Sequence, residues 1–165
     1  MESRLTAQLL FKKGGDSVET APDDNGIIET LIDPKRANFY CQELAKQVLG
    51  RGVKDTQIVI GVWSFGETMA HLMALHLSCL DRRTKDVLSL PAKRRPDGQW
   101  SVDPKCSELA RGQLILVVIP GHRGKEERIP DYLMTLVKEA GGILQGVLYY
   151  DGAFLSPSAG EYAAT

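Results

Sequence analysis

The chain has 165 residues, the usual size of one domain and enough to bury one well-packed core. Hydrophobic residues make up 43% and charged residues 25%, an ordinary globular composition that excludes a disordered or fibrous chain. Lysine and arginine total 20 against 21 for aspartate and glutamate, so the formal net charge of −1 gives no overall attraction to nucleic acid or an anionic membrane. We therefore expect no nucleic-acid partner and no membrane role, and any basic site must be local.

The cysteines Cys41, Cys79 and Cys106 are odd in number and include no CxxC pair, which favours neither a disulfide framework nor a zinc cluster. This usage fits a reducing compartment. The apolar patch at residues 9–11 is too short for a signal peptide or a membrane-spanning helix. We therefore expect a cytoplasmic protein.

The first 25 residues are predicted to form a short helix and a polar loop, and residues 26–32 a short strand. Asp33-Pro34 is a helix start signal, because aspartate accepts a backbone N–H at the N-cap and proline fits the first helical position. Apolar residues then recur at helical spacing on one face, and Gly50 and Gly52 end this predicted helix.

A β-branched run from Gln57 to Val62 predicts a strand that is buried on both faces. Residues 68–80 predict a mostly apolar helix that packs on the same sheet. Residues 86–90 are predicted as another strand, followed by a basic hairpin-like stretch at residues 93–98 and a return strand at Trp100–Val102.

The last third predicts a βαβ unit, with a strand at Leu114–Ile119, a helix at Pro130–Ala140 and a strand at Ile143–Tyr150. The Gly141-Gly142 pair ends the helix. The alternating order of elements therefore predicts an α/β fold with a central, mostly parallel sheet flanked by helices.

The sequence shows no internal repeat and no second domain. We expect an N-terminal helix and loop over residues 1–25, one α/β domain over residues 26–155, and a flexible polar tail over residues 156–165.

In an open parallel sheet, ligands bind beyond the carboxyl ends of the strands. The first candidate loop, residues 61–68, brings glycines and hydroxyl groups to a helix N-terminus, where free N–H groups favour an anion. The alternative is a tight turn whose aromatic side chains pack as a lid. The candidate phosphate- or pyrophosphate-binding residues of this loop are Trp63, Ser64, Phe65, Gly66 and Thr68.

The second candidate loop follows the strand at Leu114–Ile119 and is locally basic. An arginine fork and a lysine point charge both suit phosphate. The alternative is a solvated loop whose charges face the neighbouring Glu126 and Glu127. The candidate residues of this loop are Gly121, His122, Arg123, Gly124 and Lys125.

Two further groups of polar residues could belong to a binding site. The basic run Lys93-Arg94-Arg95 is either a solvated turn or part of a mobile loop beside the ligand site. His71 and His76 lie five positions apart and do not share a helix face, so no metal site is predicted.

The order of these elements resembles the orotate phosphoribosyltransferases, within the type I phosphoribosyltransferase family, from about Gly26 to Gly152. Ile32-Asp33-Pro34 resembles the family's early segment, and residues 58–61 with Gly66 resemble its strand and pyrophosphate loop. Leu114–Val118 resembles the strand that leads into its phosphoribosyl-diphosphate loop. Residues 138–142, running into 146–148, resemble the family's helix end and next strand.

The resemblance implies a homodimer, in which the basic run would be the mobile loop that reaches a neighbouring subunit's site.

The departures from this family concern chemistry. Where the family has two acidic residues that hold the ribose hydroxyls of its magnesium-bound diphosphate substrate, this chain has Ile119 and Pro120. Phe65 stands where a basic residue is frequent, and Gly152 stands where an arginine would contact orotate.

Three functions remain open. The first is a phosphoribosyltransferase-like protein that has lost transferase activity and binds a phosphate-bearing small molecule or nucleotide without a cofactor. The second is an active orotate-type transferase of nucleotide biosynthesis, which would need magnesium. The third is a non-catalytic dimerising scaffold. The loss of the acidic pair favours the first and third over the second.

Overall fold

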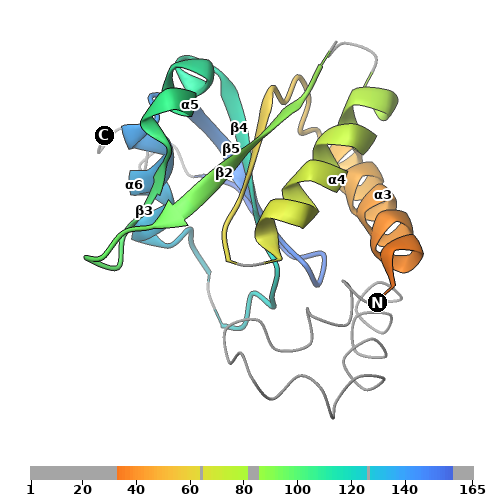
Figure 1. The fold of residues 1–165 in the computed structure, drawn as a ribbon. Helices are drawn as coiled ribbons and strands as arrows, with labels where there is room; N and C mark the ends of the chain where they lie inside the picture. Colours follow the sequence, from red (N-terminus) through yellow and green to blue (C-terminus); the bar gives the residue numbers. More distant parts are fainter. Residues whose placement is uncertain (1–32, 64, 82–85, 126, 158–165) are drawn as a thin grey trace.

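The computed structural model describes residues 33–63, 65–81, 86–125 and 127–157 (Figure 1). The helix and loop predicted for residues 1–25, the strand predicted for 26–32 and most of the predicted tail lie outside these residues. The described elements are, in chain order, α3 (Pro34–Gly50), β1 (Ile58–Gly61), α4 (Gly66–Leu80), β2 (Leu88–Arg94), β3 (Trp100–Val102), α5 (Pro104–Ala110), β4 (Leu114–Ile119), α6 (Asp131–Glu139), β5 (Ile143–Tyr149) and β6 (Phe154–Leu155).

The strands of the described ranges form one six-stranded sheet in the order β3-β2-β1-β4-β5-β6. The four inner strands pair in parallel, whereas β3 and β6 pair antiparallel at the two edges. The predicted α/β fold with a mostly parallel sheet is therefore confirmed. The C-terminal ends of the parallel strands β1, β4 and β5 lie on the same side of the sheet, which we call the carboxyl edge.

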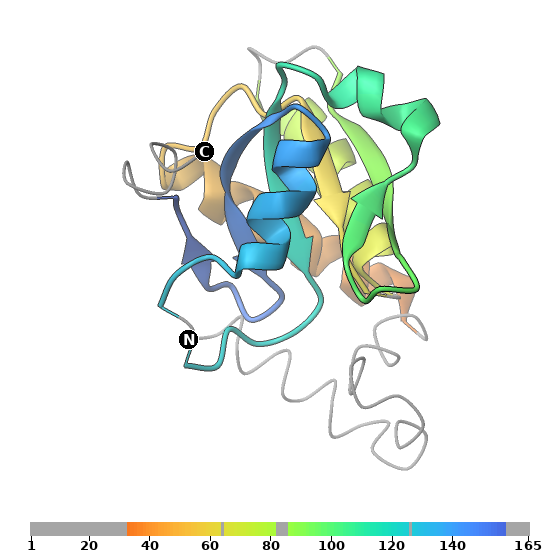
Figure 2. The same ribbon diagram turned by 90° about the vertical axis from the view of Figure 1, so that its left-hand side faces the viewer.

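Two helical layers cover the sheet (Figures 1 and 2). Helices α3 and α4 pack on one face with Leu116 and Val118 of β4, while α5 and α6 pack on the other with Ile115, Val117 and Ile119. Because successive side chains of a strand point to opposite faces, β4 must be apolar at every position to serve both layers. This double burial explains the unbroken apolar run in the sequence.

The predicted signals at the helix ends have the expected geometry. Oδ1 of Asp33 accepts a hydrogen bond from the backbone N–H of Arg36 at 3.2 Å, directly before the Pro34 that opens α3. After α6, Gly141 has a φ of +76°. The N–H groups of Gly141 and Gly142 donate to the carbonyls of residues 138 and 137 in a Schellman arrangement, which turns the chain into β5.

Three elements differ from the prediction. Strand β2 begins two residues later than expected and continues to Arg94, through part of the basic run. Helix α5 was not predicted, although Asp103-Pro104 repeats the Asp33-Pro34 start signal and Asp103 Oδ1 accepts the Lys105 N–H at 2.9 Å. Strand β6 was not predicted either, because two residues are too few to show a periodicity.

Candidate functional site

The first candidate loop is a tight turn between β1 and α4. A Cβ atom added to Gly61 would lie 1.8 Å from the carbonyl oxygen of Gly66, so the two backbones approach too closely for any side chain. The Gly66 N–H donates to the Trp63 carbonyl at 3.0 Å and closes the turn. Close backbone packing therefore accounts for both glycines without a ligand.

The aromatic residues of this loop pack against the protein. Phe65 is buried, and its ring lies 6.1 Å from that of Tyr150, so its side chain is not available to a ligand. Trp63 has a φ of +70°, which a bulky residue rarely adopts, and its ring contacts Trp100 at 5.2 Å between centroids. The alternative interpretation of this loop, a turn with packed aromatics, therefore describes its observed geometry.

The remaining two candidate residues of this loop, Ser64 and Thr68, do not distinguish a ligand site from a packed turn. Thr68 is exposed in the first turn of α4, and Ser64 lies outside the described residues. The N-terminus of α4 carries Glu67 in its first turn, and a carboxylate there opposes the binding of an anion.

The predicted hairpin with its return strand at Trp100–Val102 is confirmed, whereas the interpretation of the basic run Lys93-Arg94-Arg95 as a mobile loop is wrong. Lys93 and Arg94 belong to β2 and pair with Ser101 and Trp100 of β3. The turn of this hairpin begins only at Arg95, whose N–H donates to the Gln99 carbonyl at 2.7 Å. The antiparallel pairing fixes Lys93 and Arg94 because backbone N–H and C=O groups of β2 bond to those of β3.

The three basic side chains of the run lie in different environments. The guanidinium carbon of Arg94 lies 5.7 Å from the centre of the Trp63 ring, a cation–π contact that joins the hairpin to the first loop. Lys93 is exposed. Arg95 instead bonds within its own turn and to α6, so the structure does not bring the three cations together.

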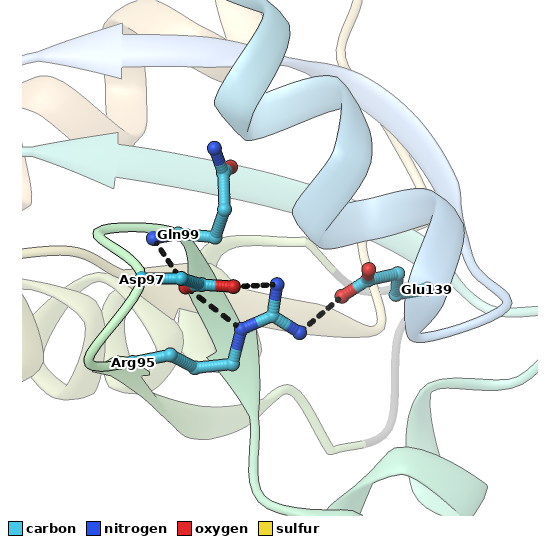
Figure 3. A network of polar contacts seen from close by, with 4 residues as sticks. All are labelled: Arg95, Asp97, Gln99 and Glu139. Carbon is cyan, nitrogen blue, oxygen red and sulfur yellow. Dashed lines mark hydrogen bonds and ion pairs between the residues drawn. The ribbon is translucent and has the colours of Figure 1, made fainter.

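Arg95 is part of a polar network that holds the hairpin against α6 (Figure 3). Its guanidinium lies 3.1 Å from Oδ2 of Asp97 and 3.7 Å from Oε2 of Glu139. The Gln99 N–H donates to the other oxygen of Asp97 at 2.9 Å. This backbone hydrogen bond, followed by the contact with Arg95, lowers the pKa of Asp97 below its ordinary value.

The base of the second candidate loop is fixed to the end of β5. The backbone N–H of Tyr150 donates to the carbonyls of both Ile119 and Gly121 at 2.9 Å, and the Gly121 N–H donates to the Ile119 carbonyl. Pro120 is the middle residue of this turn and is buried. The N–H of Gly121 is therefore engaged within the turn, while Gly124 further along has a φ of +64° that suits glycine.

The exposed part of this loop carries two cations. Arg123 and Lys125 are exposed, and among the residues that the structure describes neither forms an ion pair with a carboxylate. Of the two glutamates that the alternative interpretation set against these cations, the structure describes Glu127. Glu127 forms no ion pair with Arg123 or Lys125. These two cations face solvent at the carboxyl edge.

Helix α6 begins at Asp131, one residue after the predicted start at Pro130, which is its N-cap. Arg128 lies 3.6 Å from the Asp131 carboxylate in the first turn of this helix. The helix terminus thus already carries a carboxylate, and anion binding in the loop would rest on side chains rather than on the helix.

Sequence reasoning missed Asp151, which lies next to this loop. Its Oδ2 atom lies 3.4 Å from Nδ1 of His122, and its Oδ1 atom accepts the Ala153 N–H at 3.0 Å. Only 10% of the Asp151 side chain is exposed, against 38% of His122. The signal that would have found it is its position, directly after the strand predicted at Ile143–Tyr150, at the edge where the second loop also lies.

A buried tyrosine lies beneath this edge. The Tyr40 hydroxyl donates to the Tyr150 carbonyl, and burial raises the pKa of Tyr40, with smaller contributions from Tyr150 and Asp151. Gly152, where the orotate enzymes would have an arginine, has a φ of +90° in the turn to β6. A backbone conformation that favours glycine therefore accounts for this departure.

The residues at the end of β4 do not fit a magnesium–diphosphate group. Ile119 and Pro120 are buried and apolar, and both oxygens of the nearby Asp151 already have partners. Within the described ranges, no three or more histidine, cysteine, aspartate or glutamate side chains are grouped so as to hold a metal ion.

The two helix histidines and the cysteines have ordinary surroundings. Nδ1 of His71 lies 3.5 Å from the Ser89 hydroxyl on β2, while Nε2 of His76 lies 2.8 Å from Oδ1 of Asn38 on α3, so the two rings flank opposite sides of α4. Cys41 is a core residue, and burial raises the pKa of its thiol to about 12. Among the described residues, no helix has the length and apolar character needed to cross a membrane.

Together, the strand order, the two helical layers and the loops at the carboxyl edge define a phosphoribosyltransferase-like fold. The structure is similar to the crystal structure of adenine phosphoribosyltransferase from Rhodothermus marinus, with a TM-score of 0.51 and 15% sequence identity. The alignment covers 86% of this chain and 85% of that chain. The predicted phosphoribosyltransferase-like fold is confirmed, whereas the orotate type within it stays a prediction.

No family profile and no curated protein sequence matches the chain. The similarity is therefore one of fold, and the chemistry must be argued from the residues of this chain.

Proposed function

We propose that this phosphoribosyltransferase-like protein binds a phosphate-bearing small molecule or nucleotide at residues 121–125 and has lost transferase activity. The observation that carries the proposal is the pair of exposed cations, Arg123 and Lys125, on a loop at the carboxyl edge of a parallel sheet. Open sheets of this kind bind ligands at that edge, and an arginine fork suits the oxygens of a phosphate. His122 lies between Arg123 and the turn that fixes the loop to β5, beside Asp151.

The proposed loss of transferase activity rests on the residues at the end of β4, Ile119 and Pro120. A transferase of this fold must orient the ribose ring of its diphosphate substrate, and orientation supplies a large part of the lowering of the barrier. The side chains of Ile119 and Pro120 offer no oxygen ligands there, because both are apolar and buried. The ligand is therefore bound by its phosphate alone, without magnesium or another cofactor, and the protein acts by binding.

The site is tested by isothermal titration calorimetry with pyrophosphate, phosphoribosyl diphosphate and nucleoside monophosphates, each with and without magnesium. A charged hydrogen bond is worth about 1.5–3 kcal/mol, and solvent exposure places Arg123 at the lower end. We therefore expect Arg123→Ala to weaken binding about tenfold, with no loss of fold. Lys54→Ala is the matched control, since Lys54 is an exposed cation just before β1, at the opposite edge of the sheet.

Two results would contradict the proposal. If Arg123→Ala and Lys54→Ala bind every one of these compounds equally well, or the wild type binds none, the loop is only a connection and the scaffold function is the better account. If the wild type releases pyrophosphate from phosphoribosyl diphosphate and orotate at a rate proportional to protein concentration and dependent on magnesium, the protein is an active transferase.

A further inference from the structure

The loop after β1 holds a bulky residue in a strained backbone conformation. Trp63 has a φ of +70°, in a region that glycine and asparagine adopt far more readily than tryptophan. Its side chain is half-buried, whereas that of Phe65 in the same loop belongs to the core. A small residue would form this turn without strain, so the turn itself does not explain the indole. Strained residues of this kind gather at ligand sites.

Two side chains fix the position of the indole. The Trp100 ring meets Trp63 edge to face, with the centroids 5.2 Å apart and the ring planes at 69°. Trp100 is buried in β3 and therefore gives firm support. The guanidinium carbon of Arg94 lies over the Trp63 ring, 5.7 Å from its centre. Arg94 is exposed, so the side chain that covers this face of the indole can turn away into solvent.

The indole lies beside the second candidate loop. Strand β1 lies between β2 and β4, and the three strands are parallel, so their C-terminal ends share the carboxyl edge. Arg94 ends β2, Trp63 follows β1, and residues 120–125 follow β4. The loops after β1 and β4 also contact each other, because a Cβ atom added to Gly66 would lie 3.5 Å from Cδ of Pro120. An aromatic ring and the exposed cations of the second loop are thus carried by adjoining loops.

We propose that Trp63 stacks on the base of a nucleotide whose phosphate is bound at residues 121–125. Aromatic rings and arginine guanidinium groups both stack on nucleobases. The base takes the position over the indole that Arg94 covers, and the guanidinium turns onto the outer face of the base. A purine has a larger π-face than a pyrimidine, so the ligand class is a purine nucleoside monophosphate. This inference rests on the proposed phosphate site and selects among phosphate-bearing compounds.

Calorimetry with AMP, GMP and ribose 5-phosphate tests the stacking. Stacking on one aromatic side chain is worth roughly 5–150-fold in affinity, so we expect AMP and GMP to bind at least fivefold more tightly than ribose 5-phosphate. Trp63→Asn should remove this difference, because asparagine tolerates the positive φ but has no ring. Trp63→Phe should keep part of it. Arg123→Ala is the matched control, since it should weaken all three compounds alike and leave their ratio unchanged.

Fluorescence gives a second measurement that does not require the loss of the indole. The chain has two tryptophans, so Trp100→Phe leaves Trp63 as the single emitter and keeps an aromatic ring against it. We expect saturating AMP or GMP to quench this emission, whereas saturating ribose 5-phosphate should leave it unchanged. Circular dichroism and thermal melting check that each variant is folded, and the fluorescence result decides if Trp63→Asn is not.

The outcomes separate the stacking from the phosphate site. If ribose 5-phosphate binds but AMP and GMP bind no more tightly, or if Trp63→Asn leaves their advantage intact, the stacking is refuted and the phosphate site stands. If Trp63→Asn weakens all three compounds equally, or AMP and GMP bind without quenching Trp63, the indole only supports the loop. If the wild type binds none of the three compounds, the phosphate site is refuted and the stacking with it.

Discussion

Replacing Gly61 by alanine separates the two explanations of the first loop. The added Cβ atom would lie 1.8 Å from the Gly66 carbonyl oxygen and 2.2 Å from its carbonyl carbon. These atoms belong to the backbone at the start of α4, which is itself packed on the sheet, so no flexible side chain can move aside. An ordinary contact begins at 3.4 Å, and the strand end and the helix start must therefore separate by about 1.6 Å.

Overpacking of a well-packed region costs about 1–3 kcal/mol, and more where the opposing atoms are backbone. We therefore expect Gly61→Ala to lower the free energy of unfolding by about 3 kcal/mol or more, a large part of the roughly 5–15 kcal/mol of a typical domain. In urea, with a slope of about 2 kcal/mol per molar, the unfolding midpoint should fall by about 1.5 M.

Gly50→Ala is the matched control. Gly50 is the last residue of α3, and a Cβ atom there meets nothing within 4 Å. Alanine should therefore stabilise the protein slightly, by about 0.4–1 kcal/mol, because it restricts the unfolded chain. The reasoning fails if Gly61→Ala leaves the midpoint within about 0.3 M of wild type. Weaker pyrophosphate binding at unchanged stability would instead assign Gly61 to a ligand site.

Two further predictions concern titration. Because the Gln99 N–H and Arg95 lower the pKa of Asp97, its contribution to stability is present above the ordinary carboxyl pKa and is lost as the pH falls through the lowered value. Carbon-detected NMR should therefore find Asp97 titrating below about 3.9, and Arg95→Ala should raise its midpoint; a midpoint that Arg95→Ala leaves unchanged would rule out the contribution of the guanidinium. Burial raises the pKa of Cys41 to about 12, so the unfolded chain releases this proton at lower pH than the folded one, and stability should fall as the pH rises above about 8.5. Cys41→Ala should reduce that alkaline slope in urea denaturation, and iodoacetamide should modify Cys41 in urea but not in the native protein; rapid labelling of native Cys41 would contradict its burial.

Much of the fold could be predicted because its signals are local. Asp33-Pro34 starts a helix through one side-chain hydrogen bond and one fixed φ angle, and Gly141-Gly142 ends another through a positive φ, so neither depends on distant residues. The unbroken apolar run of β4 likewise predicts a strand buried on both faces. The same local signal at Asp103-Pro104 would have predicted α5.

The candidate site was less predictable, because its residues are defined by contacts between distant segments. The sequence places two glycines at the first loop but does not show that Gly61 meets the Gly66 backbone. It places Phe65 beside them but does not show that the ring packs on Tyr150. A glycine-rich loop for a phosphate and a glycine-rich loop for close packing have the same composition.

The sequence by itself determined the alternation of strands and helices, the parallel sheet and the apolar residues Ile119 and Pro120 at the end of β4, since each follows from residue type and spacing along the chain. Only the tertiary structure decided that Lys93 and Arg94 are strand residues, that Arg95 contacts Glu139 on α6, and that Asp151 lies against His122. These three arrangements join residues at least six positions apart, and Arg95–Glu139 and His122–Asp151 are separated by 44 and 29 positions. Pairing across such separations is selected by the packing of the whole sheet, which no local pattern encodes.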